Sequence, residues 1–159
     1  MGAGVTFVAD AMLGRLARWL RLMGYDTLYQ PTAEDHDLAR AARAEGRLLL
    51  TRDQELARRR GLRSLLIESD RLEDQLRQVL EELGLDNKSV DARCALCNTS
   101  LQAISPSEVK SRVPAYVYAR HDEFSWCPQC DKVYWRGTHW ERMKELIEKV
   151  EEAVSSPDS

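Results

Sequence analysis

Two short apolar runs in the first third of the chain each end at an aspartate, and a helical pattern follows each aspartate. Residues 5–9 precede Asp10, and Leu48–Leu50 lead through two further residues to Asp53. Ligands of parallel α/β sheets bind at the carboxyl ends of the strands, so we expect both carboxylates at one edge of a sheet. Two neighbouring negative charges favour a bound cation, and hard divalent ions such as Mg²⁺ take oxygen ligands. The pattern therefore predicts an α/β domain that carries a metal site.

Strand and helix patterns alternate between residues 5 and 86. Strands are expected at 5–9, 25–29, 47–51 and 64–67. Helices are expected at 11–23, from Asp35 or Asp37 to Gly46, at 54–60 and from Asp70 to Leu83. Such alternation predicts a mostly parallel sheet covered by helices, although it does not define the order of the strands.

Composition supports a globular chain with two parts. With 43% hydrophobic and 31% charged residues and a net charge of −3, the chain is not disordered, and nucleic acid would need a local basic patch. No apolar run is long enough for a membrane helix, so we expect a cytoplasmic protein without a membrane partner. The first 87 residues contain no lysine, and every cysteine lies later. We therefore expect one domain over 1–89, a second unit over 90–154 and a disordered tail over 155–159.

All the cysteines fall in two C-x-x-C pairs separated by 29 residues, and these are Cys94, Cys97, Cys127 and Cys130. Each pair can fold into a tight knuckle, and two knuckles complete a tetrahedral shell of four sulfurs for structural zinc. Disulfides or redox chemistry are the alternatives, and His121 or His139 could replace a cysteine ligand. A site closed by four sulfurs has no open position for water, so this zinc would be structural.

Short β segments are expected around the cysteines, at Val113 and 116–118, at 124–126 and at 133–135. A capping-box pattern, Thr138 to Glu141, then predicts a terminal helix that reaches about Val154. The aromatic residues of these segments either stack on RNA bases or fill the small core of the ribbon.

Further acidic residues could complete the metal site predicted at Asp10 and Asp53. Asp35 and Asp37 lie at the start of the helix before the second aspartate, and Asp70 follows the last strand. Hydrolysis of phosphodiesters by divalent metals needs several carboxylates to hold one or two ions. For each acid the alternative is a helix cap or a solvated charge.

Arginines recur every third residue after Asp10, at Arg15, Arg18 and Arg21, and so lie on one side of the expected helix. They could contact RNA phosphates, as could Arg52 beside the second aspartate, and a solvated helix face is the alternative. The run 58–60 is more typical of an exposed helix end.

These motifs resemble one known family. The matching segments are Asp10–Arg21, Gly24–Asp26, Gly46–Asp53, the paired cysteines and Tyr134–Trp140. Over about residues 5–145 the chain is similar to the Mut-seven C-terminal RNase domain, a family of the PIN-like nuclease superfamily with an appended zinc ribbon. The resemblance implies a three-layer α/β/α fold and a catalytic Mg²⁺ or Mn²⁺ held by Asp10, Asp35 and Asp53. His36 occupies a position where an acid is common in the family, which keeps Asp37 as an alternative to Asp35.

The first functional hypothesis is a metal-dependent ribonuclease that hydrolyses RNA phosphodiester bonds, with a zinc ribbon that helps to bind RNA. The alternative is a non-catalytic RNA-binding or ribosome-associated adaptor with a decayed nuclease site. A phosphoacceptor receiver domain also places acids at strand ends, but it uses a lysine on a later strand, and residues 1–87 have none. The sequence leaves open whether the protein forms a homo-oligomer.

Overall fold

The computed structural model describes residues 4–85 and 92–155. The strands of the first part are β1 (Phe7–Ala9), β2 (Thr27–Tyr29), β3 (Leu48–Thr51) and β4 (Ser64–Leu66). Its helices are the 3₁₀ turn η1 (Ala11–Leu13), α1 (Gly14–Leu22), α2 (Asp35–Glu45), α3 (Gln54–Ala57) and α4 (Leu72–Leu83). The second part contains β5 (Gln102–Ile104), α5 (Pro106–Val109), α6 (Ala115–Arg120), β6 (Phe124–Cys127), β7 (Lys132–Tyr134) and α7 (Thr138–Ser155).

The first four strands form a parallel sheet in the order β2-β1-β3-β4. Parallel neighbours need crossover connections, and here each crossover contains a helix. All four strands therefore end at the same edge, which we call the carboxyl edge. Asp10 follows β1 at this edge, Asp53 lies just beyond β3, and Asp70 comes after β4.

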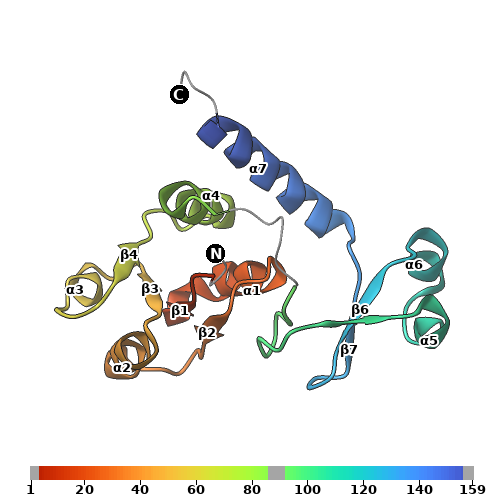
Figure 1. The fold of residues 1–159 in the computed structure, drawn as a ribbon, viewed down its shortest axis with the longest axis horizontal. Helices are drawn as coiled ribbons and strands as arrows, with labels where there is room; N and C mark the ends of the chain where they lie inside the picture. The colour runs from red at the N-terminus through yellow and green to blue at the C-terminus, as the bar shows by residue number, and fades with distance from the viewer. Residues whose placement is uncertain (1–3, 86–91, 156–159) are drawn as a thin grey trace.

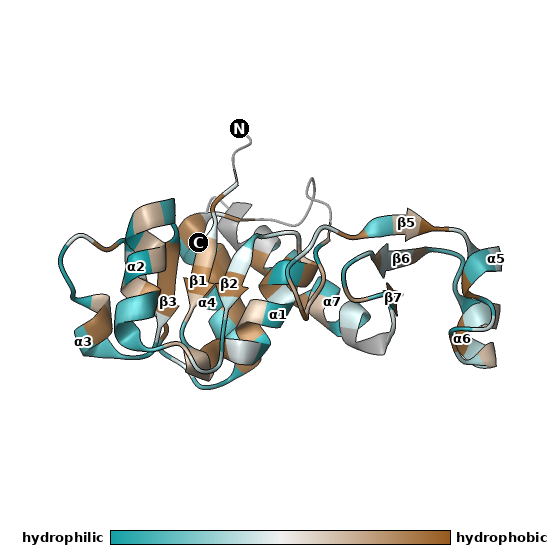
Figure 2. Cartoon of the chain, turned by 90° about the horizontal axis from the view of Figure 1, so that it is seen from below, coloured by the Kyte–Doolittle hydropathy of each residue, from teal (hydrophilic) through white to brown (hydrophobic). Residues whose placement is uncertain are grey.

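Alternate residues of the central strands face two different helical layers. Phe7 and Leu50 belong to the core that contains α1, α4 and α7, whereas Val8 and Leu49 pack with α2 and α3. This alternation follows from the two-residue period of a strand, and it explains why β1 and residues 48–50 of β3 are apolar at every position. The three-layer α/β/α fold with a mostly parallel sheet is confirmed, and Figure 2 shows the helices on either side of the sheet.

The second part is a three-stranded antiparallel sheet in the order β5-β6-β7, with α5 and α6 at its outer end (Figure 1). Its small core is formed by buried valines and Phe124, against which Trp126 and Trp135 pack. We call residues 92–135 the ribbon.

After the ribbon the chain returns to the first part, where α7 runs beside α4 (Figure 1). Met143, Leu146, Ile147 and Val150 lie in the same core as the helices α1 and α4. At the start of α7, Trp140 stacks on Trp19 of α1 with ring centroids 6.2 Å apart. The apolar face of α7 therefore packs on the sheet domain. None of the helices within 4–85 and 92–155 is long and apolar enough to span a membrane.

The structure corrects some expected boundaries. Residues 115–120 form α6, with Pro114 as the N-cap, and not a strand; α5 begins at Pro106. Proline has no amide hydrogen to donate and a φ suited to the first turn of a helix, so Pro106 and Pro114 favour helical starts. The N-cap of α2 is Glu34, not Asp35 or Asp37, and α4 begins at Leu72. Of the expected tail, Ser155 ends α7 and 156–159 lie outside the described residues.

Candidate active site and metal centre

The hydroxyl of Thr51 connects Asp10 and Asp53, the two aspartates that follow the apolar runs. Thr51 is fully buried at the end of β3, and its Oγ1 donates a hydrogen bond to Asp10 Oδ2 at 2.7 Å. The same Oγ1 accepts a hydrogen bond from the backbone N–H of Asp53 at 3.0 Å. The backbone N–H of Asp10 also bonds to the carbonyl of Leu50, 2.9 Å away. The ends of β1 and β3 are thus held together at the carboxyl edge.

Each of these carboxylates has one oxygen engaged in the protein. Asp53 is the N-cap of α3, where its Oδ1 accepts from the N–H groups of Glu55 and Leu56 at 2.9 and 3.2 Å. Asp10 uses Oδ2 for Thr51. Among the described residues, no hydrogen bond or ion pair involves Asp53 Oδ2 or Asp10 Oδ1. One oxygen of each aspartate could therefore bind a cation without loss of these contacts.

The other acidic candidates differ in how strongly the protein engages them. Asp37 forms the capping box of α2, because its Oδ2 accepts from the backbone N–H of Glu34 at 3.2 Å. Asp35 is exposed in the first turn of the same helix, with its carboxylate 3.9 Å from the guanidinium of Arg59. Asp35 is consequently the freer of the two to approach a metal.

The carboxylates do not form a closed cluster of three. Across the described parts of the chain, three or more candidate ligand atoms lie within 4.8 Å of one another in one place, which is the cysteine centre. Asp10 and Asp53 are linked through Thr51, whereas neither Asp35 nor Asp70 joins them at this distance.

A groove of about 210 Å³ lies between the N-terminal ends of α1 and α4. It is lined by Met12, Gly14, Arg15, Arg18, Asp70, Leu72 and Gln75. Both arginines are exposed, and the unpaired N–H groups of the two helix starts add positive potential there. The groove can therefore attract an anion, and Asp70 lies within it rather than beside Asp53.

Close packing holds the start of α1 at the wall of this groove. Tyr29 donates from Oη to the carbonyl of Ala11 at 2.9 Å. A Cβ on residue 14 would lie 2.7 Å from the same Oη, which is shorter than real contacts allow. Gly14 is thus required by the approach of Tyr29, and the turn after Asp10 is anchored to β2.

Arg21 does not share the surface position of Arg15 and Arg18. It is 5% exposed, and its Nε and Nη1 donate to the carbonyls of Thr27 and Ala95 at 2.9 and 2.8 Å. We therefore remove Arg21 from the candidate phosphate contacts. Arg52 is partly buried, and its Nη2 lies 3.4 Å from the carbonyl of Glu68. Its buried Nε has no hydrogen-bond partner among the described residues.

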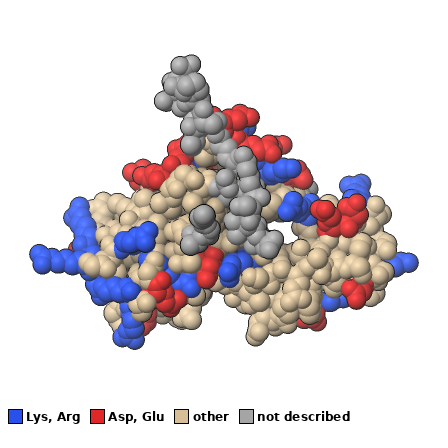
Figure 3. All heavy atoms as spheres, in the orientation of Figure 1, with Lys and Arg blue, Asp and Glu red and all other residues tan. Residues whose placement is uncertain are grey.

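Basic side chains are unevenly distributed over the surface. Figure 3 shows Lys and Arg gathered at the end of the molecule formed by α2 and α3, and Asp and Glu over α4 and α7. Residues 58–60 contribute to the basic end and are exposed, as expected from their position after α3. The carboxyl edge thus borders positive charge, through Arg59 on one side and the groove arginines on the other.

The four cysteine sulfurs form a compact centre. All lie within 4.8 Å of one another, with Cys94 to Cys130 at 3.9 Å and Cys97 to Cys127 at 3.5 Å. Tetrahedral zinc with Zn–S bonds of about 2.3 Å separates its sulfurs by roughly 3.8 Å. The donor set and its spacing therefore fit a metal ion such as zinc, and the cysteines are free rather than disulfide-bonded.

The thiols influence one another's ionisation. Burial raises the pKa of Cys97, but its hydrogen bonds with Thr99 and with the other cysteines outweigh burial and lower this pKa to about 6. The hydrogen bond with Cys97, together with burial, raises the pKa of Cys130 to about 12. Ionisation of one thiol thus disfavours ionisation of its neighbours when no cation neutralises the charge. A bound cation would favour the thiolate form of all four.

Polar groups surround the sulfurs. The hydroxyl of Tyr134 lies 3.1 Å from Cys94 Sγ and accepts from the N–H of Ala95 at 3.1 Å. Thr99 Oγ1 lies 3.2 Å from Cys97 Sγ. Such outer contacts orient metal ligands. His121 does not belong to the cluster, and the side chain of His139 lies outside the described residues.

Together these features define a three-layer α/β/α domain with acidic strand ends and an appended four-cysteine ribbon. A family model described as the Mut7-C RNAse domain matches residues 5–147. The chain therefore belongs to the Mut7-C RNAse domain family, and this membership supports a nuclease-like function. No curated protein and no solved structure matches the chain.

Proposed function

We propose that this protein is a metal-dependent ribonuclease whose active site lies at the carboxyl edge around Asp10 and Asp53. The observation that carries the proposal is the Thr51 hydroxyl, which joins both strand ends and leaves one oxygen of each carboxylate open. Asp35 is the third candidate ligand, since Asp37 is engaged in its capping box. Family membership supports the reaction class.

These acids would hold Mg²⁺ or Mn²⁺, which when bound supplies charge neutralisation at the scissile phosphate and an activated water. Thr51 orients Asp10 through the 2.7 Å hydrogen bond, and the cap bonds of α3 orient Asp53. Arg15 and Arg18 hold a neighbouring phosphate in the groove, and Arg52 is a further phosphate contact beside the edge. Asp70 contributes to the polarity of the groove rather than to the metal.

We further propose that the cysteine centre binds structural zinc and that the ribbon contributes to RNA binding. Phe124 is buried in the ribbon core, and Trp126 and Trp135 pack against that core as partly buried side chains, which makes them weaker candidates to stack on bases. Tyr116 of α6 is 66% exposed and is the better candidate for a stacking contact.

The wild-type protein is expected to cleave RNA in the presence of Mn²⁺ or Mg²⁺ and to stop when EDTA is added, because the carboxylates need the ion to bind the phosphate. The measurement is cleavage of end-labelled single-stranded and structured RNA, with single-stranded DNA of the same sequence as the control. Salt-sensitive RNA binding without any turnover would instead favour the non-catalytic adaptor. The observation that favours this alternative is that no three carboxylates of residues 4–85 and 92–155 place an oxygen each within 4.8 Å of one another.

Substitution of both groove arginines, Arg15→Ala with Arg18→Ala, is expected to weaken RNA binding and to reduce its dependence on salt. Each contact with a single-stranded phosphate contributes about 0.7 to the slope of log K against log salt, so the double variant should lose about 1.4. Titration of fluorescent RNA between low and high salt measures this slope.

Arg40→Ala is the matched control, because Arg40 is exposed on α2, which packs on the opposite face of the sheet. An unchanged salt slope in the double variant would mean that RNA does not use the groove.

A further inference from the structure

The first zinc knuckle, which we define as residues 94–98, is attached directly to the sheet domain. Asn98 accepts a hydrogen bond at Oδ1 from the backbone N–H of Thr27 at 3.1 Å. Its Nδ2 donates to Asp26 Oδ1 at 2.6 Å. Asn98 thus satisfies the first amide of β2, which is the edge strand of the sheet in the described part of the chain. Its backbone is left-handed, with φ of 72°, a conformation that asparagine tolerates better than most residues.

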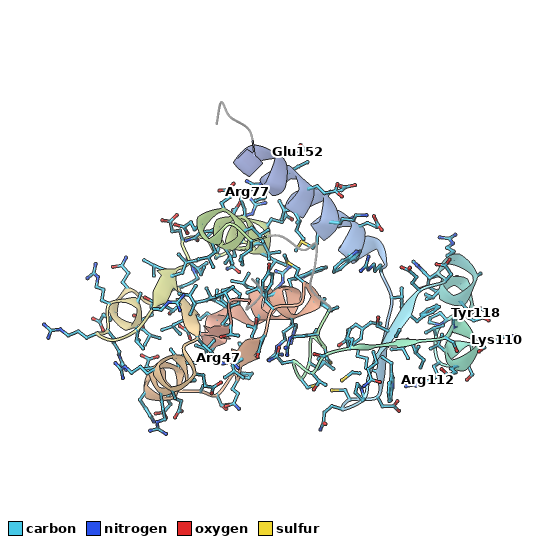
Figure 4. The ribbon with its side chains drawn as sticks, in the orientation of Figure 1. Arg47, Arg77, Lys110, Arg112, Tyr118 and Glu152 are labelled. Carbon is cyan, nitrogen blue, oxygen red and sulfur yellow. The ribbon has the colours of Figure 1, made fainter. Side chains whose placement is uncertain are left out.

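A partly buried ion pair between Arg47 and Asp26 connects the hydrogen bond of Asn98 to the sheet. Arg47 donates to Asp26 Oδ1 and Oδ2 at 2.9 and 3.3 Å, and also to the carbonyl of Phe7 at 3.1 Å. Figure 4 labels Arg47 at the sheet domain. Burial raises the pKa of Asp26, but the hydrogen bonds from Arg47 and Asn98 outweigh burial, and the pKa lies below its ordinary value. Asp26 therefore remains an ionised acceptor for both partners.

A second connection comes from the buried Arg21 of α1. Its guanidinium bridges the carbonyl of Thr27 in β2 and the carbonyl of Ala95 in the knuckle, and its own carbonyl accepts from the N–H of Arg93 at 2.8 Å. Arg93 in turn donates to the carbonyl of Asn98 at 2.9 Å. Without the knuckle in place, a buried guanidinium would lose a partner, which costs more than the loss of an exposed contact.

We infer that Asn98 and Arg21 are positioning residues through which metal binding at the cysteine centre stabilises β2 and α1 of the sheet domain. The knuckle turn that places Asn98 and the Ala95 carbonyl is the turn that brings Cys94 and Cys97 to the metal. Binding of the ion to this turn and docking of the turn on β2 therefore favour one another. The linkage rests on the proposed structural metal at the cysteine centre and is independent of whether the carboxyl edge is catalytic.

This linkage has a consequence for the assembly of the protein. Metal loss would release the knuckle, expose the unpaired edge of β2 and remove the restraint on the ribbon. The stack of Trp19 with Trp140 would then remain as a contact that holds the start of α7 to α1. The ribbon would thus be held in a defined orientation in the metal-loaded form, and the sheet domain would respond to zinc supply.

The test is hydrogen exchange of the full chain with zinc and after removal of zinc by a chelator. In wild type, chelation is expected to speed exchange of the amides of residues 26–29 on the order of tenfold, including the Thr27 amide bonded to Asn98. Amides of Leu49 and Leu50, in the middle of β3, serve as the internal reference. Equal protection of β2 with and without zinc would overturn the inference.

Asn98→Gly separates docking of the knuckle on β2 from metal binding. Glycine keeps the left-handed backbone but removes the side-chain amide that bonds to Asp26 and Thr27. This variant is expected to keep one zinc per chain by native mass spectrometry, and to show fast β2 exchange whether or not zinc is present. Leu96 lies in the same knuckle and is 57% exposed, so the control variant Leu96→Ala should behave like wild type. A zinc effect on β2 in Asn98→Gly as large as in wild type would overturn the role of Asn98. Should that variant fail to fold, the wild-type comparison decides the matter alone.

Discussion

Asp10→Asn combined with Asp53→Asn is expected to reduce metal-dependent RNA hydrolysis by a factor on the order of 10²–10³ or more, the loss that follows removal of a principal group that stabilises the transition state. An amide oxygen carries no net charge, so the pair would no longer attract a divalent cation to the carboxyl edge. The measurement is the single-turnover cleavage rate of end-labelled RNA at saturating Mn²⁺.

The structure predicts that this double variant remains folded. Asparagine is as good an N-cap as aspartate, so its side-chain oxygen can still accept the hydrogen bonds that the N–H groups of Glu55 and Leu56 donate to Asp53 Oδ1. The matched control is Glu81→Gln, which removes a charge from an exposed position on α4, remote from the carboxyl edge. Hydrolysis by the double variant at the wild-type rate would contradict the proposed site.

If the cysteine centre binds zinc as proposed, Cys127→Ser is expected to abolish that binding and to unfold the ribbon. Cys127 is fully buried, and its Sγ lies 3.5 Å from that of Cys97 and accepts from the N–H of Cys130. A serine hydroxyl is a poor ligand for zinc, and apparent binding free energies of about 10–16 kcal/mol are typical of structural zinc in small folds. Metal content per chain and the thermal unfolding midpoint are the two measurements.

Gln129→Ala tests whether any change in the second knuckle, residues 127–130, also abolishes metal binding. Gln129 is exposed between the two cysteines of that knuckle and is not a ligand, so its variant should retain zinc and unfold at the wild-type temperature. If Cys127→Ser carries as much zinc as wild type, the four-sulfur centre is not the metal site.

Local patterns in the sequence were sufficient for the α/β class and for the cysteine centre. β1 and residues 48–50 of β3 are apolar because alternate residues enter different cores, and segments with a helical pattern lie between the two strands. Gly46 and Gly84 end α2 and α4 in the left-handed conformation that glycine adopts without strain. The two C-x-x-C pairs determine their own turns, so the four sulfurs could be grouped before the ribbon was known.

The candidate site was predicted in part. The acids at the ends of β1 and β3 do lie at one edge, because parallel strands end together. Thr51 was missed as a site residue. The sequence did contain a signal for it, because a hydroxyl residue follows an apolar run and stands two positions before Asp53. Asn98 was missed for a different reason. Its partners, Asp26 and Thr27, are more than 70 positions away, and no local pattern connects them.

The sequence by itself determined which segments form strands, helices and knuckles, since periodicity, glycine and cysteine spacing act over a few residues. Only the tertiary structure decided what those segments contact. It buried Arg21 while leaving Arg15 and Arg18 at the groove, and it packed α7 on α4 rather than on the ribbon that precedes it. Those outcomes depend on which apolar surfaces meet when the chain closes, and such long-range contacts are not encoded by the spacing of residues within any one segment.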